Sequence, residues 1–285
     1  SRTQPAPLHA FWLFFPAAAI LGALVVPLSV YTVQSGTGWP PGLLGAGHGH
    51  ELVFGFALAL IAGYTLGPQP RPTLLLLFAL WLAARASWLL MPDSAVAQIL
   101  SPAFALVLAR YAVPRFSAAK RWRNKAAGPL ILLLCLLAVV FWLTRNARAD
   151  SALPDPQRLM TTAVLGLLML MTFIGGRIIA PAVAGTLEKK GRSLEARVQP
   201  RIEGALILLL AGTILLSLMP TPDALPGLAL MVCAGLILVR ILRWQLWHCP
   251  ERPDLLILAL GYLWLAVGSA ATGWHLLIGA SAIPA

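Results

Sequence analysis

The chain has 285 residues, of which 59% are hydrophobic and 11% are charged, and its formal net charge is +11. Soluble domains carry about 25% charged residues, so this composition excludes a soluble globular protein. The basic residues lie in short stretches between apolar runs, which favours membrane loops over a nucleic-acid-binding surface. We therefore expect no nucleic acid among the partners.

Apolar runs of about 20 residues recur along the whole chain, flanked by Pro, Gly or basic residues. This pattern predicts an all-α fold: a polytopic transmembrane helical bundle that forms a single domain over residues 1–285 in the lipid bilayer. We predict ten spans, at 8–33, 48–66, 72–91, 94–113, 128–145, 158–182, 201–219, 224–244, 253–272 and 274–285. The last is too short to cross about 30 Å of hydrocarbon. Either the natural chain continues beyond Ala285, which we favour, or this segment is re-entrant or interfacial.

Apart from Arg85, the Lys and Arg residues lie in the loops or near the span ends, and they are distributed unevenly between the two sides of the predicted bundle. Seventeen fall on the side of the N-terminus, and only Arg145, Arg148 and Arg158 fall on the other side. Cytoplasmic loops carry an excess of Lys and Arg. We therefore predict that the N-terminus is cytoplasmic and that the chain crosses the membrane many times.

The stretch from Gly45 to Tyr64 carries His48, His50 and Glu51 at the head of the second span. Ionisable side chains at the edge of a bilayer are costly and mark function, and neutral imidazole ligates haem iron and copper. Within a helix, His48 and His50 would be about 200° apart. Either His48 lies in a glycine-rich lead-in and converges with His50, or the two face different sites. The alternative role for both is to cap the helix start and contact water.

His275 is predicted at the same depth as His48 and His50, at the outer end of another span. Two histidines from two helices at a matched depth can hold an intramembrane haem, so these three are candidate metal or haem ligands. Arg85 lies in the outer part of the third span, where it must be paired or hydrated. Glu51 or a haem propionate would satisfy its guanidinium. The alternative is a structural Arg–Glu pair with no cofactor.

A second layer of candidate residues is predicted at the inner end of the bundle. His9 opens the first span, and Arg177 lies near the inner end of the sixth. One interpretation is a second cofactor between them, and the alternative is that both side chains simply reach the interface. His248 and Cys249 adjoin each other in a short loop and form a weak candidate for a soft-metal pair.

Several segments of the chain resemble conserved signatures of the NnrS family, in the same order and over most of the length. They are GHGHELVFGFALALIAGY, LWLAARASWL, MTFIGGRIIAPAV, and LGYLWLAVG followed by WHLLIGA. The chain departs from the family pattern at Ala259, where the family has His, and in the segment after Tyr64. It is also shorter than the usual member, which indicates a divergent or shortened one.

The resemblance implies a function that the composition and the spacing of residues do not themselves indicate. NnrS proteins are bacterial inner-membrane proteins that contain haem and copper and are linked to denitrification and nitric oxide stress. By resemblance, we expect haem b and copper as cofactors, nitric oxide as a ligand, and subunits of a respiratory or denitrification complex as partners. Matched position by position, the family resemblance supports His48, His50 and His275 as cofactor ligands. It also singles out Arg85 and Arg177, whose roles are less defined.

Three functions remain open at this point. The chain is a haem-binding accessory or electron-transfer protein of the nitric oxide response, which we expect. Alternatively, it is an enzyme whose haem turns over nitric oxide, with or without copper. The third alternative is a metal or haem transporter or chaperone in which the two histidine layers are successive stops. A purely structural subunit is the least informative interpretation.

Overall fold

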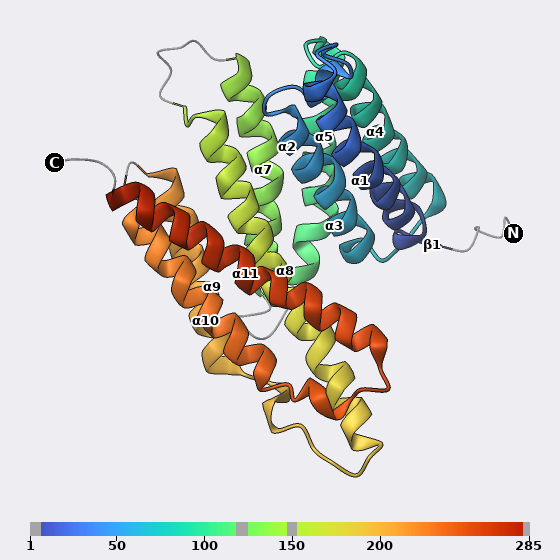
Figure 1. Cartoon of the computed structure of the whole chain (residues 1–285). Coiled ribbons are helices and arrows are strands. Elements are labelled where there is room, and N and C mark those ends of the chain that lie inside the picture. Colours follow the sequence, from blue (N-terminus) through green and yellow to red (C-terminus); the bar gives the residue numbers. More distant parts are fainter. Residues whose placement is uncertain (1–6, 118–124, 147–152, 220, 282–285) are drawn as a thin grey trace, which may run out of the picture. The chain divides into compact units, whose positions relative to one another are not determined.

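The computed structural model describes residues 7–117, 125–146, 153–219 and 221–281, and most of these lie in helices (Figure 1). Eight of the described helices are long and apolar enough to cross a membrane. They are α1 (Phe11–Gln34), α4 (Arg71–Leu90), α5 (Ala95–Ser117), α7 (Ala127–Asn146), α8 (Pro156–Glu188), α9 (Pro200–Leu218), α10 (Ala224–Leu242) and α11 (Pro253–Ser281). The all-α, multi-pass membrane class predicted from the sequence is therefore confirmed.

The predicted number of ten spans is wrong, because the ninth and tenth form one helix. α11 runs without interruption from Pro253 to Ser281. Its interior contains no proline, and the glycine before Trp274 is tolerated at a cost of about 1 kcal/mol. Residues 282–285 of the predicted tenth span lie outside the described residues.

The second predicted span, 48–66, is helical but not uniform. It consists of α2 (Gly47–His50), a π-helical segment η2 (Glu51–Ala57) and α3 (Leu58–Thr65). Before it lies a short 3₁₀ turn, η1 (Pro41–Leu43). Apolar content along a sequence does not distinguish an α-helix from a π-helical segment, so this irregularity could not be predicted.

The chain divides into two compact units, residues 1–163 and 164–285. The first contains the helices up to α7 and the beginning of α8, and the second contains the remainder of α8 with α9, α10 and α11. The single transmembrane domain over residues 1–285 stays a prediction, as does the orientation of the N-terminus.

In the first unit, α1 packs against α3 and η2, while α5 packs against α4 and α7. Phe14 of α1 is fully buried and meets the edge of the Trp81 ring, with 6.4 Å between ring centroids. Gly63 allows α3 to approach α1, since a Cβ there would lie 2.5 Å from the Phe15 ring. At the N-terminal end of α1, β1 (Leu8–His9) pairs antiparallel with β2 (Pro68–Gln69). This pairing ties the start of the first span to the end of α3.

In the second unit, α10 packs closely against α11. Two glycines face each other across this contact: a Cβ on Gly227 would lie 3.0 Å from the backbone oxygen of Gly273. Small residues let membrane helices approach in this way. Tyr262 of α11 lies against Gly175 of α8, where a Cβ would lie 2.6 Å from the Tyr262 ring. Close backbone packing therefore positions the polar side chains of this unit.

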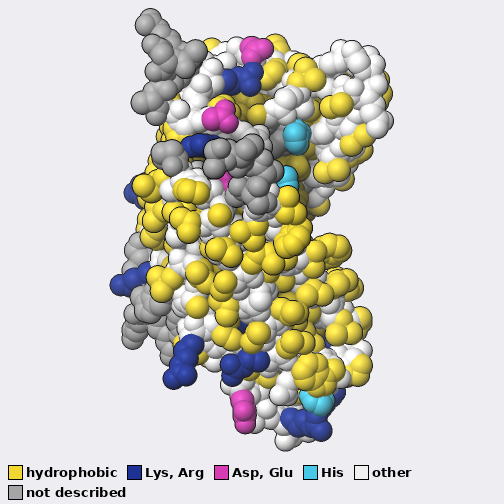
Figure 2. Space-filling model, turned by 60° about the vertical axis from the view of Figure 1, so that its left-hand side comes forward, with side chains coloured by type: hydrophobic (Ala, Val, Ile, Leu, Met, Phe, Trp, Pro, Cys, Tyr) yellow, Lys and Arg dark blue, Asp and Glu magenta, His cyan; other side chains and the backbone are white. Residues whose placement is uncertain are grey.

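Large apolar side chains remain exposed on the outside of the helices. Leu76 and Ile257 are each at least 70% exposed. Figure 2 shows hydrophobic side chains over most of the visible face, with few charged side chains among them. Such a surface is far larger than soluble monomers expose, and a bilayer covers it without cost.

Candidate functional site

Glycines bring the segment before the second span onto the C-terminal end of α4. A Cβ on Gly42 would lie 2.7 Å from the Leu89 Cα, and one on Gly47 would run into the backbone of Gly42. Gly45 has a φ of +54°, a conformation that favours glycine. The Trp88 Nε1–H then donates to the Gly42 oxygen at 3.0 Å. These contacts place His50, the last residue of α2, beside α4.

The π-helical segment η2 begins immediately after His50. π-helical turns are rare and frequently lie at functional sites, because they change the direction of side chains and loosen the backbone hydrogen bonding. Here the Gly55 oxygen accepts a hydrogen bond from Trp81 Nε1 at 3.0 Å. A Cβ on Gly55 would lie 3.0 Å from Cδ of Arg85. Glycine at this position therefore leaves a path for Arg85 to reach Glu51.

Four buried polar side chains form a closed ring of hydrogen bonds. Arg85 Nη1 donates to Glu51 Oε1 at 2.6 Å, and Arg85 Nη2 donates to Ser101 Oγ at 2.7 Å. His50 completes the ring: its Nδ1 lies 3.1 Å from Glu51 Oε1, and its Nε2 lies 3.3 Å from Ser101 Oγ. Each of the four side chains belongs to a residue at most 2% exposed. The Arg–Glu pair that the sequence offered for Arg85 is therefore present.

The ring of hydrogen bonds assigns the tautomer of His50. The Glu51 carboxylate, paired with Arg85, can only accept, so the His50 proton lies on Nδ1. Nε2 is then an acceptor and receives the Ser101 hydroxyl hydrogen. Metal-binding histidines commonly donate their second ring nitrogen to a carboxylate in this way. His50 therefore has the tautomer of a ligating imidazole, with its Nε2 lone pair engaged by the Ser101 hydroxyl.

Aromatic rings enclose His50. The Trp88 ring stacks on the imidazole at 3.5 Å between centroids and 13° between planes. The rings of Phe54 and Phe141 each lie 5.2 Å from it. Above Trp88, the Arg145 guanidinium carbon lies 5.1 Å from the ring. These aromatic side chains hold the imidazole in one orientation and keep water away, which strengthens the hydrogen bonds among the four polar side chains.

Two atoms of the polar ring have no hydrogen-bond partner among the described residues: Glu51 Oε2 and Arg85 Nε. Buried polar atoms are rarely left unpaired, so an absent water or ligand group is the physical explanation. The described part of the chain has no group of three or more His, Cys, Asp or Glu side chains that could hold a metal ion. Haem needs only one or two axial ligands from the protein. The imidazole of His50 could therefore serve as a single ligand of haem iron.

His48 does not join this ring. Its side chain is exposed, and its Nδ1 donates to the Gly45 oxygen at 2.8 Å. Of the two arrangements that the sequence left open, the structure shows the one in which His48 and His50 face different sites. Because the backbone oxygen fixes the Nδ1 proton, Nε2 of His48 is an exposed acceptor.

The remaining candidate residues lie elsewhere. His9 is exposed in β1, at the opposite end of α1 from α2. His275 is exposed on α11, in the second unit. Arg177, also in the second unit, lies 3.4 Å from Glu203 and 4.1 Å above the Phe173 ring. The proposed pairings of His275 with His50, and of Arg177 with His9, each join the two units and stay predictions.

The adjacent His248 and Cys249 are engaged in local contacts. His248 Nδ1 lies 3.1 Å from Arg192 Nη1, which donates to it, and the His248 oxygen accepts from Lys190 Nζ at 2.7 Å. Cys249 is buried, and burial raises the pKa of its thiol. A protonated thiol is a poor metal ligand, so these contacts do not favour a soft-metal pair.

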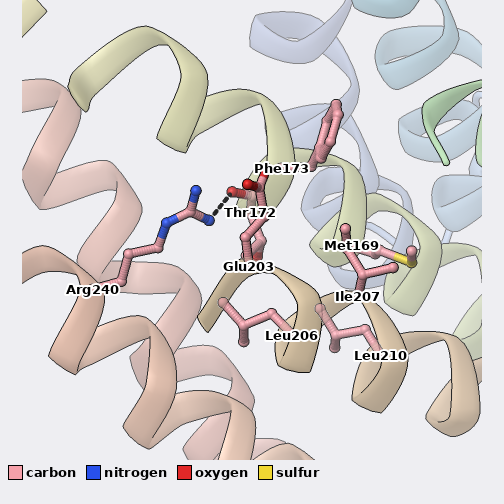
Figure 3. Close-up of a pocket in the computed structure, with 8 residues that line it drawn as sticks. All are labelled: Met169, Thr172, Phe173, Glu203, Leu206, Ile207, Leu210 and Arg240. Carbon is pink, nitrogen blue, oxygen red and sulfur yellow. Dashed lines mark hydrogen bonds between the residues drawn. The ribbon is translucent and has the colours of Figure 1, made fainter. Parts of the chain in front are cut away.

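Sequence reasoning missed Ser101 and Arg240. Ser101 lies 51 residues from His50 in an apolar run, and only the packing of α5 against α4 brings it to the ring. Arg240 is one of the seventeen basic residues counted on the side of the N-terminus, but it lies inside α10 (Figure 3) and is 5% exposed. An arginine four residues inside the predicted end of a span was the available signal.

Comparison with known proteins identifies a family for this chain. The family model described as NnrS protein matches residues 7–285. No curated protein and no solved structure matches the chain.

Proposed function

The chain belongs to the NnrS family, and from this premise we propose that it is a haem-binding protein of the bacterial inner membrane that acts in the nitric oxide response. Family membership supports a nitric-oxide-response membrane protein, and the eight apolar helices support many membrane crossings. We further propose an accessory or electron-transfer role within denitrification, with the N-terminus in the cytoplasm.

The observation that carries this proposal is the buried imidazole of His50. Glu51 accepts from Nδ1 and so leaves the lone pair on Nε2, while Arg85 donates to the same Glu51 oxygen. Trp88 fixes the plane of the ring by stacking. A bound haem would supply a redox-active iron that could also bind an imidazole or nitric oxide.

Ser101 has to release Nε2 before His50 can bind iron. Rotation of the hydroxyl hydrogen frees the lone pair, but Ser101 Oγ itself lies 3.3 Å from Nε2, so the side chain must also change rotamer and give up its contact with Arg85. Glu51 then still links His50 to Arg85, while the Ser101 side of the ring of hydrogen bonds is open. The residues of this chain thus hold the imidazole, its proton and its charge balance, whether or not the iron is present.

His275 stays a candidate haem ligand from the sequence, where it is predicted at the same membrane depth as His50. Turnover of nitric oxide would need an open coordination position on a bound haem, whereas a bis-histidine electron-transfer haem would need none. Carbon monoxide binding to the reduced protein distinguishes the two. Copper remains a proposal from the family, with exposed His48 as the candidate ligand, and metal analysis of the purified protein tests it.

Visible spectra of the purified protein, oxidised and reduced with dithionite, test this proposal. We expect low-spin b-type bands in the wild type and in His48→Ala, and loss of these bands in His50→Ala. The His48 variant is a matched control because it removes an imidazole two residues away that points elsewhere. Loss of the bands in His275→Ala would support a bis-histidine haem. A wild-type protein from haem-replete cells that shows no Soret band would refute haem binding.

A further inference from the structure

Ser101 of α5 covers the nitrogen through which His50 would bind iron. Its Oγ lies 3.3 Å from His50 Nε2 and accepts a hydrogen bond from Arg85 Nη2 at 2.7 Å. Ser101 is 2% exposed, so bulk water does not compete for these two hydrogen bonds. Any ligand that approaches His50 Nε2 therefore competes with the Ser101 side chain for the same position.

The residue after Ser101 provides its hydroxyl with a second hydrogen-bond acceptor. Pro102 lies inside α5, and proline has no backbone N–H. The Gln98 oxygen, four residues before Pro102, therefore lacks its usual helical donor. Gln98 is three residues before Ser101, and a serine hydroxyl in a helix can donate to a carbonyl three or four residues before it. The Gln98 oxygen is thus an acceptor within α5 for the Ser101 hydroxyl.

Other serine hydroxyls of the first unit adopt this back-bonded position. Ser29 Oγ in α1 donates to the carbonyl four residues before it at 2.6 Å. Ser87 Oγ in α4 donates to the carbonyl three residues before it at 3.2 Å. Ser101 instead bonds side chains of two other elements, His50 of α2 and Arg85 of α4. Rotation about χ1 of Ser101 takes its hydroxyl from the first arrangement to the second.

We propose that Ser101 is a latch on the imidazole of His50, which it holds in the haem-free protein and releases by rotating towards the Gln98 oxygen. This inference rests on the proposed haem site and adds a positioning residue that sets its affinity. Ser101 bonds both His50 and Arg85 when haem is absent, and neither when His50 binds iron. It therefore stabilises the haem-free state selectively, and by linkage it weakens haem binding by the same factor.

Haem titration of the full-length protein in detergent, with Ser101→Ala beside the wild type, tests the latch. We expect Ser101→Ala to bind haem about tenfold more tightly, which corresponds to about 1.4 kcal/mol and to the loss of a buried hydrogen bond in the haem-free state alone. Ser29→Ala is the matched control, because it removes a helical hydroxyl of the same unit that takes no part in the ring. Its haem affinity should equal that of the wild type.

Unfolding of the same proteins gives a second readout, which a merely structural serine would not change. Without haem, Ser101→Ala should unfold more readily than the wild type. At saturating haem this difference should disappear, because Ser101 has then left both partners. Pro102→Ala supplies a helical N–H to the Gln98 oxygen and so removes the second acceptor. It should weaken haem binding, and it tests the latch if Ser101→Ala does not fold.

The outcomes separate the latch from the haem proposal on which it rests. Haem binding by the wild type, with equal or weaker binding by Ser101→Ala, would overturn the latch and leave the haem site standing. A stability loss of the same size with and without haem would also overturn it, since Ser101 would then hold its contacts in both states. Absence of haem binding in both proteins would refute the haem site and the latch together.

Discussion

Glu51→Gln removes the only charged partner of Arg85 in the buried ring. The two side chains are 0% and 3% exposed, and their charged atoms lie 2.6 Å apart. At an effective dielectric constant of about 20, the attraction over this distance is on the order of 6 kcal/mol, and the cost of burying both charges offsets much of it. Removing one partner leaves the other buried and unpaired, which costs about 3–5 kcal/mol. We expect a loss of this size in the free energy of unfolding.

The assay is reversible unfolding in mixed detergent micelles, with the double variant Glu51→Gln/Arg85→Gln closing the cycle. The double variant should lose clearly less than the sum of the two single variants, because no isolated charge remains. Asp93→Asn is the matched control: it breaks the Asp93–Arg145 ion pair, in which the Asp93 side chain is 85% exposed, and should have little effect. Additive losses, or a Glu51→Gln loss no larger than that of Asp93→Asn, would refute the reasoning.

Three further predictions concern other contacts. Gly176→Ala should destabilise the protein by about 1–3 kcal/mol in the same unfolding assay, because the added Cβ meets the buried guanidinium of Arg240. Gly185→Ala, on the same helix, is the control: its Cβ enters open space, so the change should be neutral or stabilising. Ser101→Ala should cost about 1–3 kcal/mol by leaving a buried donor unpaired, yet it should retain the haem bands. The hydrogen bond from Lys190 lowers the pKa of Glu251, so its stabilising effect should be present above the unfolded pKa and lost as pH falls through the folded value. The stability difference between wild type and Glu251→Gln, followed from pH 7 downwards, checks this sign.

Membrane spans could be predicted from the sequence because a transmembrane helix satisfies its backbone within its own segment. Eight of the predicted spans correspond to separate helices or helical segments with ends shifted by a few residues. The break predicted before Trp274 failed because a single glycine does not end a helix whose surroundings are apolar throughout. The π-helical segment after His50 could not be predicted, since an apolar run does not distinguish it from an α-helix and its contact with Trp81, at the Gly55 oxygen, is 26 residues away in sequence.

The candidate site was only partly within reach of the sequence. His50, Glu51 and Arg85 stood out because ionisable residues are rare in apolar runs, and the charge of Arg85 required a partner such as Glu51. Helix geometry predicted that His48 and His50 would point in different directions if both lay in a helix. It did not predict whether His48 would instead lie in a lead-in and converge with His50. Ser101 is a common residue in membrane helices and carries no signal of its own. Its role depends on a contact between helices that only the three-dimensional packing shows.

Titration of haem into purified haem-free protein tests the central claim most directly. The wild type should develop sharp low-spin bands and saturate, and His48→Ala should do the same. His50→Ala should develop neither the bands nor saturable binding, because it lacks the imidazole that Glu51 orients. Equal haem binding by the wild type and His50→Ala would contradict the assignment of His50 as an axial ligand.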